Sequence, residues 1–251
     1  MKQLADIAEG ILDLGREVGS GLLELAWPTR CAICDMPGDL LCRECDSELP
    51  RIDHSDSCPR CGAPYGRIIC TECWDRLGFI EHGFSHATCA VGYSRETARL
   101  VKCYKDQGEL GLAHILASLI WEALESDAGA FRDGSPDAIV YVPATPGAFL
   151  RRGYDHMLIV AEALSEMSGL GVVHALCKAD SEDQRSLGKR ARKENMEGAF
   201  GIACNPEEVE GRRLLLVDDV LTTGATLGEA SRMLYGAGAV DVSVATVCRV
   251  W

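Results

Sequence analysis

The sequence predicts an α/β protein with a doubly wound, mostly parallel sheet and a cysteine-rich module in front of it. Two observations predict the sheet. From residue 82 onward, strand-like apolar runs alternate with helical patterns, and the run at 214–217 leads through a polar loop into a helix. A third observation predicts the module, because four C-x2-C pairs lie within residues 31–73. The chain of 251 residues is long enough for one α/β core and a small appendage.

Residues 213–226, RLLLVDDVLTTGAT, carry most of the chemistry. The apolar run predicts a buried parallel strand that stops at Asp218 and Asp219. The loop that follows contains Gly224, which lets the backbone close around a small anion, and it leads into a helix N-terminus. Its hydroxyl donors are Thr222, Thr223 and Thr226. Carboxylates only accept hydrogen bonds, so the acids should face sugar hydroxyls or a metal. The predicted ligand is a sugar phosphate.

This run closely resembles the phosphoribosyl pyrophosphate (PRPP) signature of type I phosphoribosyltransferases, in which two acids and two further residues precede T-T-G-x-T. The resemblance implies that Asp218 and Asp219 contact the ribose hydroxyls of PRPP, which binds with Mg²⁺. It also implies that the 5′-phosphate lies on Thr222, Thr223, Gly224, Ala225 and Thr226. The alternative is a Thr-capped turn without a ligand. A Walker A loop is excluded, because no Lys follows the glycine.

Composition narrows the class of protein. The net charge of −13 argues against a generally cationic nucleic-acid surface, so any DNA contact must come from a local patch. No stretch reads as a membrane span, and acids at Asp6, Glu9 and Asp13 stand where a signal peptide would carry positive charge. We therefore expect a cytoplasmic protein. Residues 1–27 predict an amphipathic helix whose acidic polar face favours packing on the protein over lying on a membrane.

Eight of the thirteen cysteines form the C-x2-C pairs, and two structural Zn²⁺ ions are the expected ligands. Short loops favour two sequential groups of four, and an interleaved pairing is the alternative. Disulfides are disfavoured in a cytoplasmic protein. The predicted zinc ligands are Cys31, Cys34, Cys42, Cys45, Cys58, Cys61, Cys70 and Cys73. The other cysteines, Cys89, Cys103, Cys177, Cys204 and Cys248, are expected to be small core residues.

A second strand-like run, DAIVYVP, repeats the first arrangement with the charges reversed. It ends at Pro143 and Ala144, and Arg151 and Arg152 follow a tight turn. Their fork-shaped guanidinium groups suit diphosphate oxygens, so we count these four residues with the ligand site. A predicted helix at 94–109 carries further basic residues, which form either a solvated face or part of a positive rim.

The segment VPATPGAFLRRGYDH resembles the V-P-…-R-G-F-N-Q segment of the ComF family, phosphoribosyltransferase-like proteins with a cysteine-rich zinc module in front. The C-x2-C pairs, the Lys-bearing stretch at 93–105 and QRSLGKRARKENMEGAF at 184–200 agree with that family. One departure is that Asp155 and His156 stand where the family usually has Asn and Gln, so the resemblance assigns them no role. The implied organisation is an N-terminal helix at 1–27, a double zinc ribbon at 28–80 and a type I phosphoribosyltransferase fold at 81–251.

Residues 178–193 carry six basic and three acidic side chains. They have the place in the chain order of the mobile basic loop that closes over pyrophosphate in type I transferases, which would bring Lys189, Arg190 and Arg192 to the ligand. A charged surface helix is the alternative.

The family implies a part in handling incoming single-stranded DNA during natural transformation, with DNA-uptake proteins as partners. The first hypothesis is therefore a protein that binds or transfers PRPP and is coupled to that DNA. The alternatives are a non-catalytic adaptor that binds a nucleotide or a DNA end, and a salvage transferase for a nucleobase or an amine. Acceptors of the 6-oxopurine type are disfavoured, because Thr222 stands where those enzymes typically have Asp.

Overall fold

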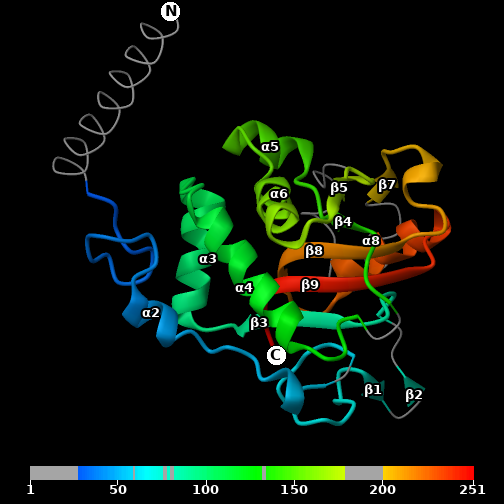
Figure 1. The fold of residues 1–251 in the computed structure, drawn as a ribbon, viewed down its shortest axis with the longest axis horizontal. Coiled ribbons are helices and arrows are strands. Elements are labelled where there is room, and N and C mark those ends of the chain that lie inside the picture. The colour runs from blue at the N-terminus through cyan, green and yellow to red at the C-terminus, as the bar shows by residue number, and fades with distance from the viewer. Residues whose placement is uncertain (1–27, 59, 76–77, 80–81, 132–133, 179–199) are drawn as a thin grey trace, which may run out of the picture. The chain divides into compact units, whose positions relative to one another are not determined.

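The computed structural model describes residues 28–58, 60–75, 78–79, 82–131, 134–178 and 200–251 (Figure 1). The expected N-terminal helix and the basic residues Lys189, Arg190 and Arg192 lie outside this part of the chain. The described residues fall into two compact units, divided between Glu48 and Leu49. One cysteine group belongs to each unit, and the second group shares its unit with the sheet.

The smaller unit is a tight turn followed by a short helix. The turn is closed by the backbone of Asp35, whose N–H donates to the carbonyl of Cys31 (2.9 Å) and whose φ is 67°. An isolated antiparallel bridge joins Arg30 to Pro37, and helix α2 spans Arg43–Ser47. Two cysteines lie on the turn and two flank or lie within α2, which is the arrangement that a pair of C-x2-C knuckles gives.

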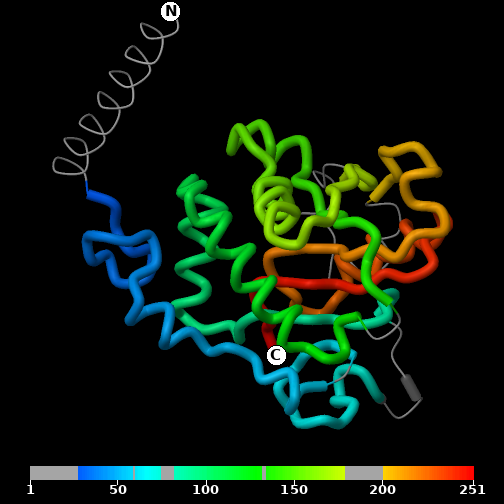
Figure 2. The backbone as a smooth tube through the Cα atoms, viewed as in Figure 1, coloured from blue at the N-terminus to red at the C-terminus, as the bar shows by residue number. Residues whose placement is uncertain are grey.

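The larger unit is built on a five-stranded parallel sheet with the order β3-β9-β8-β4-β5. Its strands are β3 (Ala87–Gly92), β4 (Ala138–Tyr141), β5 (Gly171–Val173), β8 (Arg213–Leu221) and β9 (Asp241–Arg249). Figure 2 traces β9 between β3 and β8. The central strands are buried on both faces, as expected of a parallel sheet covered by helices, so the predicted α/β class is confirmed.

In the described part of the chain, four longer helices surround this sheet (Figure 1). They are α3 (Arg95–Gln107), α4 (Leu112–Ser126), α6 (His156–Ser168) and α8 (Ala225–Gly236). α4 and α6 pack against each other and on the strands, whereas α8 packs on β8 and β9. One core cluster joins Leu227 and Leu234 of α8 to Leu214 and Leu216 of β8. Because neighbours along a strand point to opposite faces, Leu215 lies on the face away from α8.

Smaller elements complete the larger unit. Helix α5 spans Pro146–Arg152. Two antiparallel pairs lie apart from the main sheet, and 3₁₀ turns form at His54–Asp56 and Pro206–Glu208. The pairs are β1 (Trp74–Asp75) with β2 (Gly78–Phe79), and β6 (Leu176–Lys178) with β7 (Phe200–Ile202).

The chain between the two cysteine groups pairs with the outer edge of β3. Arg51 forms an antiparallel bridge with Val91. The N–H of Ile52 donates to the carbonyl of Ala90 (3.1 Å), and the N–H of Gly92 donates to that of Pro50 (2.8 Å). Residues 50–52 therefore act as a short extra strand on this edge of the sheet.

Two expectations differ from the structure. The central strand does not stop at the acids, because β9 continues to pair with β8 up to Leu221 after the ladder with β4 has ended at Val217. Cys177 is exposed rather than buried, because β6 lies outside the main sheet and alternate residues of that strand face outward. Cys89 and Cys248 are buried, and Cys103 and Cys204 are partly exposed. No helix in the described ranges has both the length and the apolar character needed to cross a membrane.

Candidate functional site

The loop between β8 and α8 has the features of an anion-binding turn. Gly224 adopts φ 76°, a conformation that favours glycine, and it directly precedes the first residue of α8. Its carbonyl accepts the first helical hydrogen bond, from the N–H of Gly228 (2.7 Å). Thr222 and Thr223 are exposed and Thr226 is half-buried, so hydroxyl donors surround the positive end of the helix. A phosphate group fits such a loop.

The two acids lie just before this loop and are both buried. The N–H of Asp219 donates to Oδ1 of Asp218 (2.9 Å). From α3, the Lys105 ammonium forms an ion pair with the Asp219 carboxylate. From α6, Nε2 of His156 lies 3.4 Å from Asp219 Oδ2, in a contact that is electrostatic rather than a well-aligned hydrogen bond. The structure therefore brings two distant basic side chains to Asp219.

This environment shifts the pKa values of the two acids in opposite directions. Burial, together with the neighbouring charge of Asp219, raises the pKa of Asp218 to about 7. Burial acts in the same direction on Asp219, but His156 and Lys105 outweigh it and hold the pKa of Asp219 well below its usual range. The pair thus titrates as a unit that keeps one charge throughout and gains a second near neutral pH.

A second amine lies beside the pair. Burial lowers the pKa of Lys178, and the charge of Asp218 opposes that shift. The Lys178 ammonium also lies over the ring of Phe200, 5.2 Å from its centroid. Lys105 thus pairs with one carboxylate, and Lys178 lies within the electrostatic reach of the other.

The structure gives Asp155 a role that the sequence left unassigned. Its Oδ1 accepts hydrogen bonds from the N–H groups of Met157 (3.1 Å) and Leu158 (3.4 Å), so it caps the N-terminus of α6. Its Oδ2 accepts a hydrogen bond from the N–H of Ala144 (2.8 Å). Asp155 therefore fastens Ala144, in the segment that follows β4, to the helix that carries His156.

The two arginines after β4 point in different directions. Arg151 is exposed, and its Nη1 donates to the Gly147 carbonyl of its own helix (3.1 Å). Arg152 turns toward α3 and α6, where its Nη2 lies 3.5 Å from Asp106 Oδ1 and its Nη1 lies 3.5 Å from Nδ1 of His156. The structure thus brings Arg152 next to the side chain that contacts Asp219 and leaves Arg151 on the surface of α5.

Sequence reasoning missed the pairing of Lys105 with Asp219. The pattern placed Lys105 on a basic helix face, but nothing in it connects a lysine to an acid 114 residues away. The two side chains meet only in the fold, which brings the C-terminal part of α3 to Asp219 of β8.

The eight clustered cysteines form two groups of four, and within each group all ligand atoms lie within 4.8 Å of one another. The sulfurs of Cys34 and Cys42 are 3.7 Å apart, and those of Cys61 and Cys70 are 3.5 Å apart. A tetrahedral Zn²⁺ with Zn–S bonds of about 2.3 Å requires about 3.8 Å between sulfurs, whereas a disulfide requires about 2.05 Å. All eight cysteines are free, so their geometry fits zinc and the grouping is sequential.

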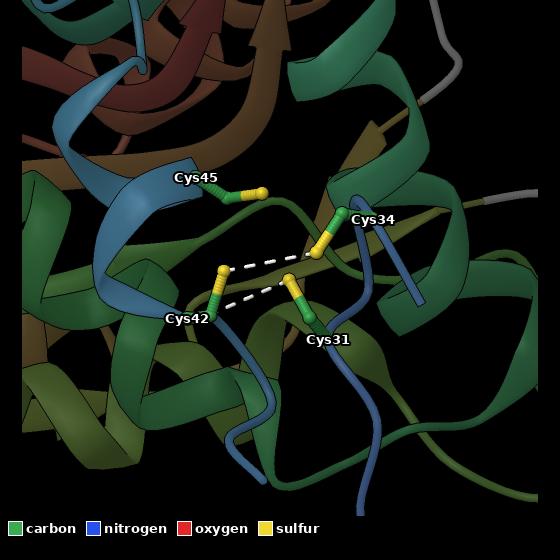
Figure 3. Close-up of side chains that lie close together, drawn as sticks. All are labelled: Cys31, Cys34, Cys42 and Cys45. Carbon is green, nitrogen blue, oxygen red and sulfur yellow. Dashed lines mark hydrogen bonds between the residues drawn. The ribbon is translucent and has the colours of Figure 1, made fainter. Parts of the chain in front are cut away.

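The two groups share one local geometry. Figure 3 shows the sulfurs of Cys31, Cys34, Cys42 and Cys45 turned toward a common centre. The N–H of Cys42 points to the sulfur of Cys31 (3.4 Å), and the N–H of Cys70 points to that of Cys58 (3.4 Å). Such contacts stabilise thiolates. Because four thiolates leave zinc no open position, both sites are structural.

The parallel sheet with its acid pair and threonine loop, in a chain with two four-cysteine sites, defines a phosphoribosyltransferase-fold protein that carries zinc ribbons. Comparison with family models agrees: the phosphoribosyl transferase domain matches residues 158–250, and the double zinc ribbon domain matches residues 22–67. Both matches agree with the resemblance to the ComF family, whose members join these two domains.

Three known proteins are similar to this chain. Competence protein F of Haemophilus influenzae is 31% identical over 147 residues, which cover 58% of this chain and 64% of that protein. DNA utilization protein YhgH of Escherichia coli (strain K12) is 35% identical over 123 residues, 45% of this chain and 50% of that protein. Competence protein ComFC of Streptococcus pneumoniae is 26% identical over 209 residues, 83% of this chain and 87% of that protein. The matched part of this chain thus covers less than two thirds of the length of the first two of these proteins.

Proposed function

We propose that this protein binds PRPP together with Mg²⁺ at the carboxyl end of β8. The observation that carries the proposal is the continuous order of buried acid pair, threonine loop with Gly224 at positive φ, and helix N-terminus. The loop N–H groups and threonine hydroxyls would hold the 5′-phosphate. Asp218 and Asp219 would accept hydrogen bonds from the ribose hydroxyls and share the Mg²⁺ with PRPP oxygens.

The basic side chains around the acids support the diphosphate half of the ligand. In the described structure the charge of Asp219 is partly balanced by Lys105. When ribose hydroxyls or Mg²⁺ take over that carboxylate, the Lys105 ammonium would become free to bind the diphosphate. Lys178, which the charge of Asp218 influences, and Arg152, which lies beside His156, would assist. Lys189, Arg190 and Arg192, which lie outside the described residues, would close over the same group.

The relatives' names supply the biological half of the proposal. Two of them are named as competence proteins and one as a DNA utilization protein. We infer that this chain acts in the cytoplasm on incoming single-stranded DNA, in contact with DNA-uptake proteins. A net charge of −13 restricts DNA binding to local basic patches. Pyrophosphate release from PRPP, measured with bases, amines and single-stranded DNA, separates a transferase from an adaptor that only binds PRPP.

The decisive experiment is calorimetric titration of PRPP in Mg²⁺ into wild type and into the double variant Asp218→Ala with Asp219→Ala. Each lost charge-assisted hydrogen bond is worth roughly 1.5–3 kcal/mol, so binding should weaken at least about tenfold. The double Asn variant preserves the shape of the site and should show the same loss. A wild-type protein that takes up no PRPP would refute the proposal.

The matched control removes the same charge elsewhere. Glu125 and Glu166 are exposed on α4 and α6, so Glu125→Ala with Glu166→Ala deletes two carboxylates without touching the loop. This variant should bind PRPP as the wild type does. Equal losses in the two double variants would mean that net charge, and not the acid pair, controls binding.

A further inference from the structure

A buried arginine joins the second cysteine site to the loop that follows the acid pair. The second site consists of Cys58, Cys61, Cys70 and Cys73, and the first of Cys31, Cys34, Cys42 and Cys45. Arg249, at the end of β9, is only 2% exposed. Its Nε donates to the carbonyl of Cys61 (3.3 Å), and its Nη1 donates to those of Leu221 (3.3 Å) and Thr222 (2.7 Å). Its Nη2 pairs with the carboxylate of Glu72, which lies between the last two cysteines of the site. One guanidinium thus contacts both knuckles of the cysteine site and the first residues of the loop.

A second connection runs through residues 82–84. Nε2 of His82 lies 3.1 Å from the sulfur of Cys73, and its ring stacks on Phe84 with 5.4 Å between centroids. The same ring lies against Gly224, where an added Cβ would be 3.4 Å from His82 Nδ1. The carbonyl of His82 approaches the first turn of α8 so closely that a Cβ on Gly228 would lie 2.1 Å from it. The far side of the loop therefore also rests on the cysteine site.

These contacts explain how a buried guanidinium is tolerated. Removing a charge from water is costly unless its donors find good acceptors, and the planar fork of arginine meets several at once here. Two of its partners, Cys61 and Glu72, belong to the segment held by the four thiolates. A segment of this kind loses its fold when its metal leaves. Arg249 would then keep a buried charge with too few partners, and the carbonyls of Leu221 and Thr222 would lose their donor.

We propose that the second cysteine site controls the conformation of the ligand-binding loop, and that Arg249 and His82 are the positioning residues that transmit this control. The importance of the loop for PRPP rests on the function proposed above, whereas the link between cysteine site and loop rests on the contacts alone. By reciprocity, a ligand on the loop stabilises the second site against metal loss. The second ribbon thus becomes part of the sugar-phosphate site.

The two cysteine sites provide a matched comparison. Cys58→Ser with Cys70→Ser disrupts the second site, and Cys31→Ser with Cys42→Ser removes the equivalent pair from the first, since the same N–H contact to sulfur joins each pair. Each variant should keep about one zinc per chain. Hydrogen–deuterium exchange of peptides covering residues 220–228 should be at least about tenfold faster in the second-site variant and unchanged in the first-site variant. PRPP affinity should follow the same order.

Variants of Arg249 retain all eight thiolates and so decide the question even if the second-site variant unfolds. Arg249→Met replaces the guanidinium by an apolar chain of similar length, and Arg249→Lys keeps the charge but cannot bridge Cys61 and Thr222 together. Both should still carry about two zinc ions, yet exchange faster in the loop. Release of zinc from wild type, followed with a colorimetric chelator, should become slower for one of the two ions when PRPP is added, and this protection should vanish in both variants.

Three results would overturn the coupling. The first is hydrogen–deuterium exchange of the loop at the wild-type rate in Arg249→Met and Arg249→Lys. The second is equal loop exchange in the two cysteine variants. The third is a rate of zinc release that PRPP does not change, although wild type binds PRPP. If wild type does not bind PRPP at all, the proposed function fails. The exchange measurements still decide the coupling in that case, because they need no ligand.

Discussion

PRPP binding should strengthen as the pH rises from 6 to 8, because the pKa of Asp218 is raised to about 7 by its burial and by the charge of Asp219. Ribose hydroxyls and Mg²⁺ both prefer the ionised carboxylate. The ionised fraction of Asp218 grows from about one tenth at pH 6 to about nine tenths at pH 8. The apparent Kd is inversely proportional to this fraction, because only the ionised form binds the ligand well. The expected gain is therefore about tenfold, or about 1.4 kcal/mol.

Isothermal titration with Mg²⁺ and PRPP at pH 6, 7 and 8 measures this gain, and Asp218→Asn isolates its source. The phosphate groups of PRPP also titrate, with a second pKa near 6 for such groups, and they contribute equally in both proteins. The variant imitates the protonated acid at every pH, so its affinity should change with pH only as far as the phosphates titrate, and it should bind at least about tenfold more weakly than wild type at pH 8. Parallel pH profiles in the two proteins would refute the assignment of a titrating Asp218.

Three further outcomes follow from the sequence and the fold. Elemental analysis should give about two zinc ions per chain, and a value below one with oxidised thiols would contradict the sites. Burial raises the pKa of Asp127, but hydrogen bonds from His86 and Thr88 bring it down to about 2. Because this folded-state pKa lies below the unfolded value, the carboxylate contributes about 2 kcal/mol above pH 4 that is lost toward pH 2. Urea unfolding should therefore show Asp127→Asn destabilised at pH 7 and close to wild type near pH 2. Neutralising the basic cluster should reduce the slope of log affinity for single-stranded DNA against log salt concentration by about two units. An unchanged slope would favour the zinc ribbon as the DNA site. That cluster is Lys189, Arg190, Arg192 and Lys193.

The sequence predicted the parts of the fold whose signals are local. Apolar runs identified β3, β4 and β9, and helical periodicity identified α3, α4 and α8, because burial of one face leaves its period in the sequence. The end of β8 was predicted too early, because the apolar run stops at Asp218 while pairing with β9 continues. Hydrogen bonding to a neighbouring strand, unlike burial, leaves no local period.

The residues of the candidate site also fall into those that the sequence predicted and those that it did not. The acid pair, the loop and the cysteine groups are contiguous motifs, so their residue types and spacing predicted their chemistry. Lys105, His156 and Arg249 act across chain separations that no motif spans, and their partners are fixed only when α3, α6 and β9 come together around β8. Arg249 had no signal at all, since an arginine at the end of an apolar strand gives no indication that its guanidinium turns inward.

The short pairing of residues 50–52 with β3 bears on self-association. A bare sheet edge offers a row of N–H and C=O groups on which another chain can add as a strand, which is a common origin of aggregation and domain swapping. Here the connecting segment occupies that edge, and the opposite edge is β5, which spans only Gly171–Val173. Cleavage of the chain just before β3 would uncover the longer edge. Sedimentation at several concentrations should then show more self-association in the nicked protein than in the intact protein.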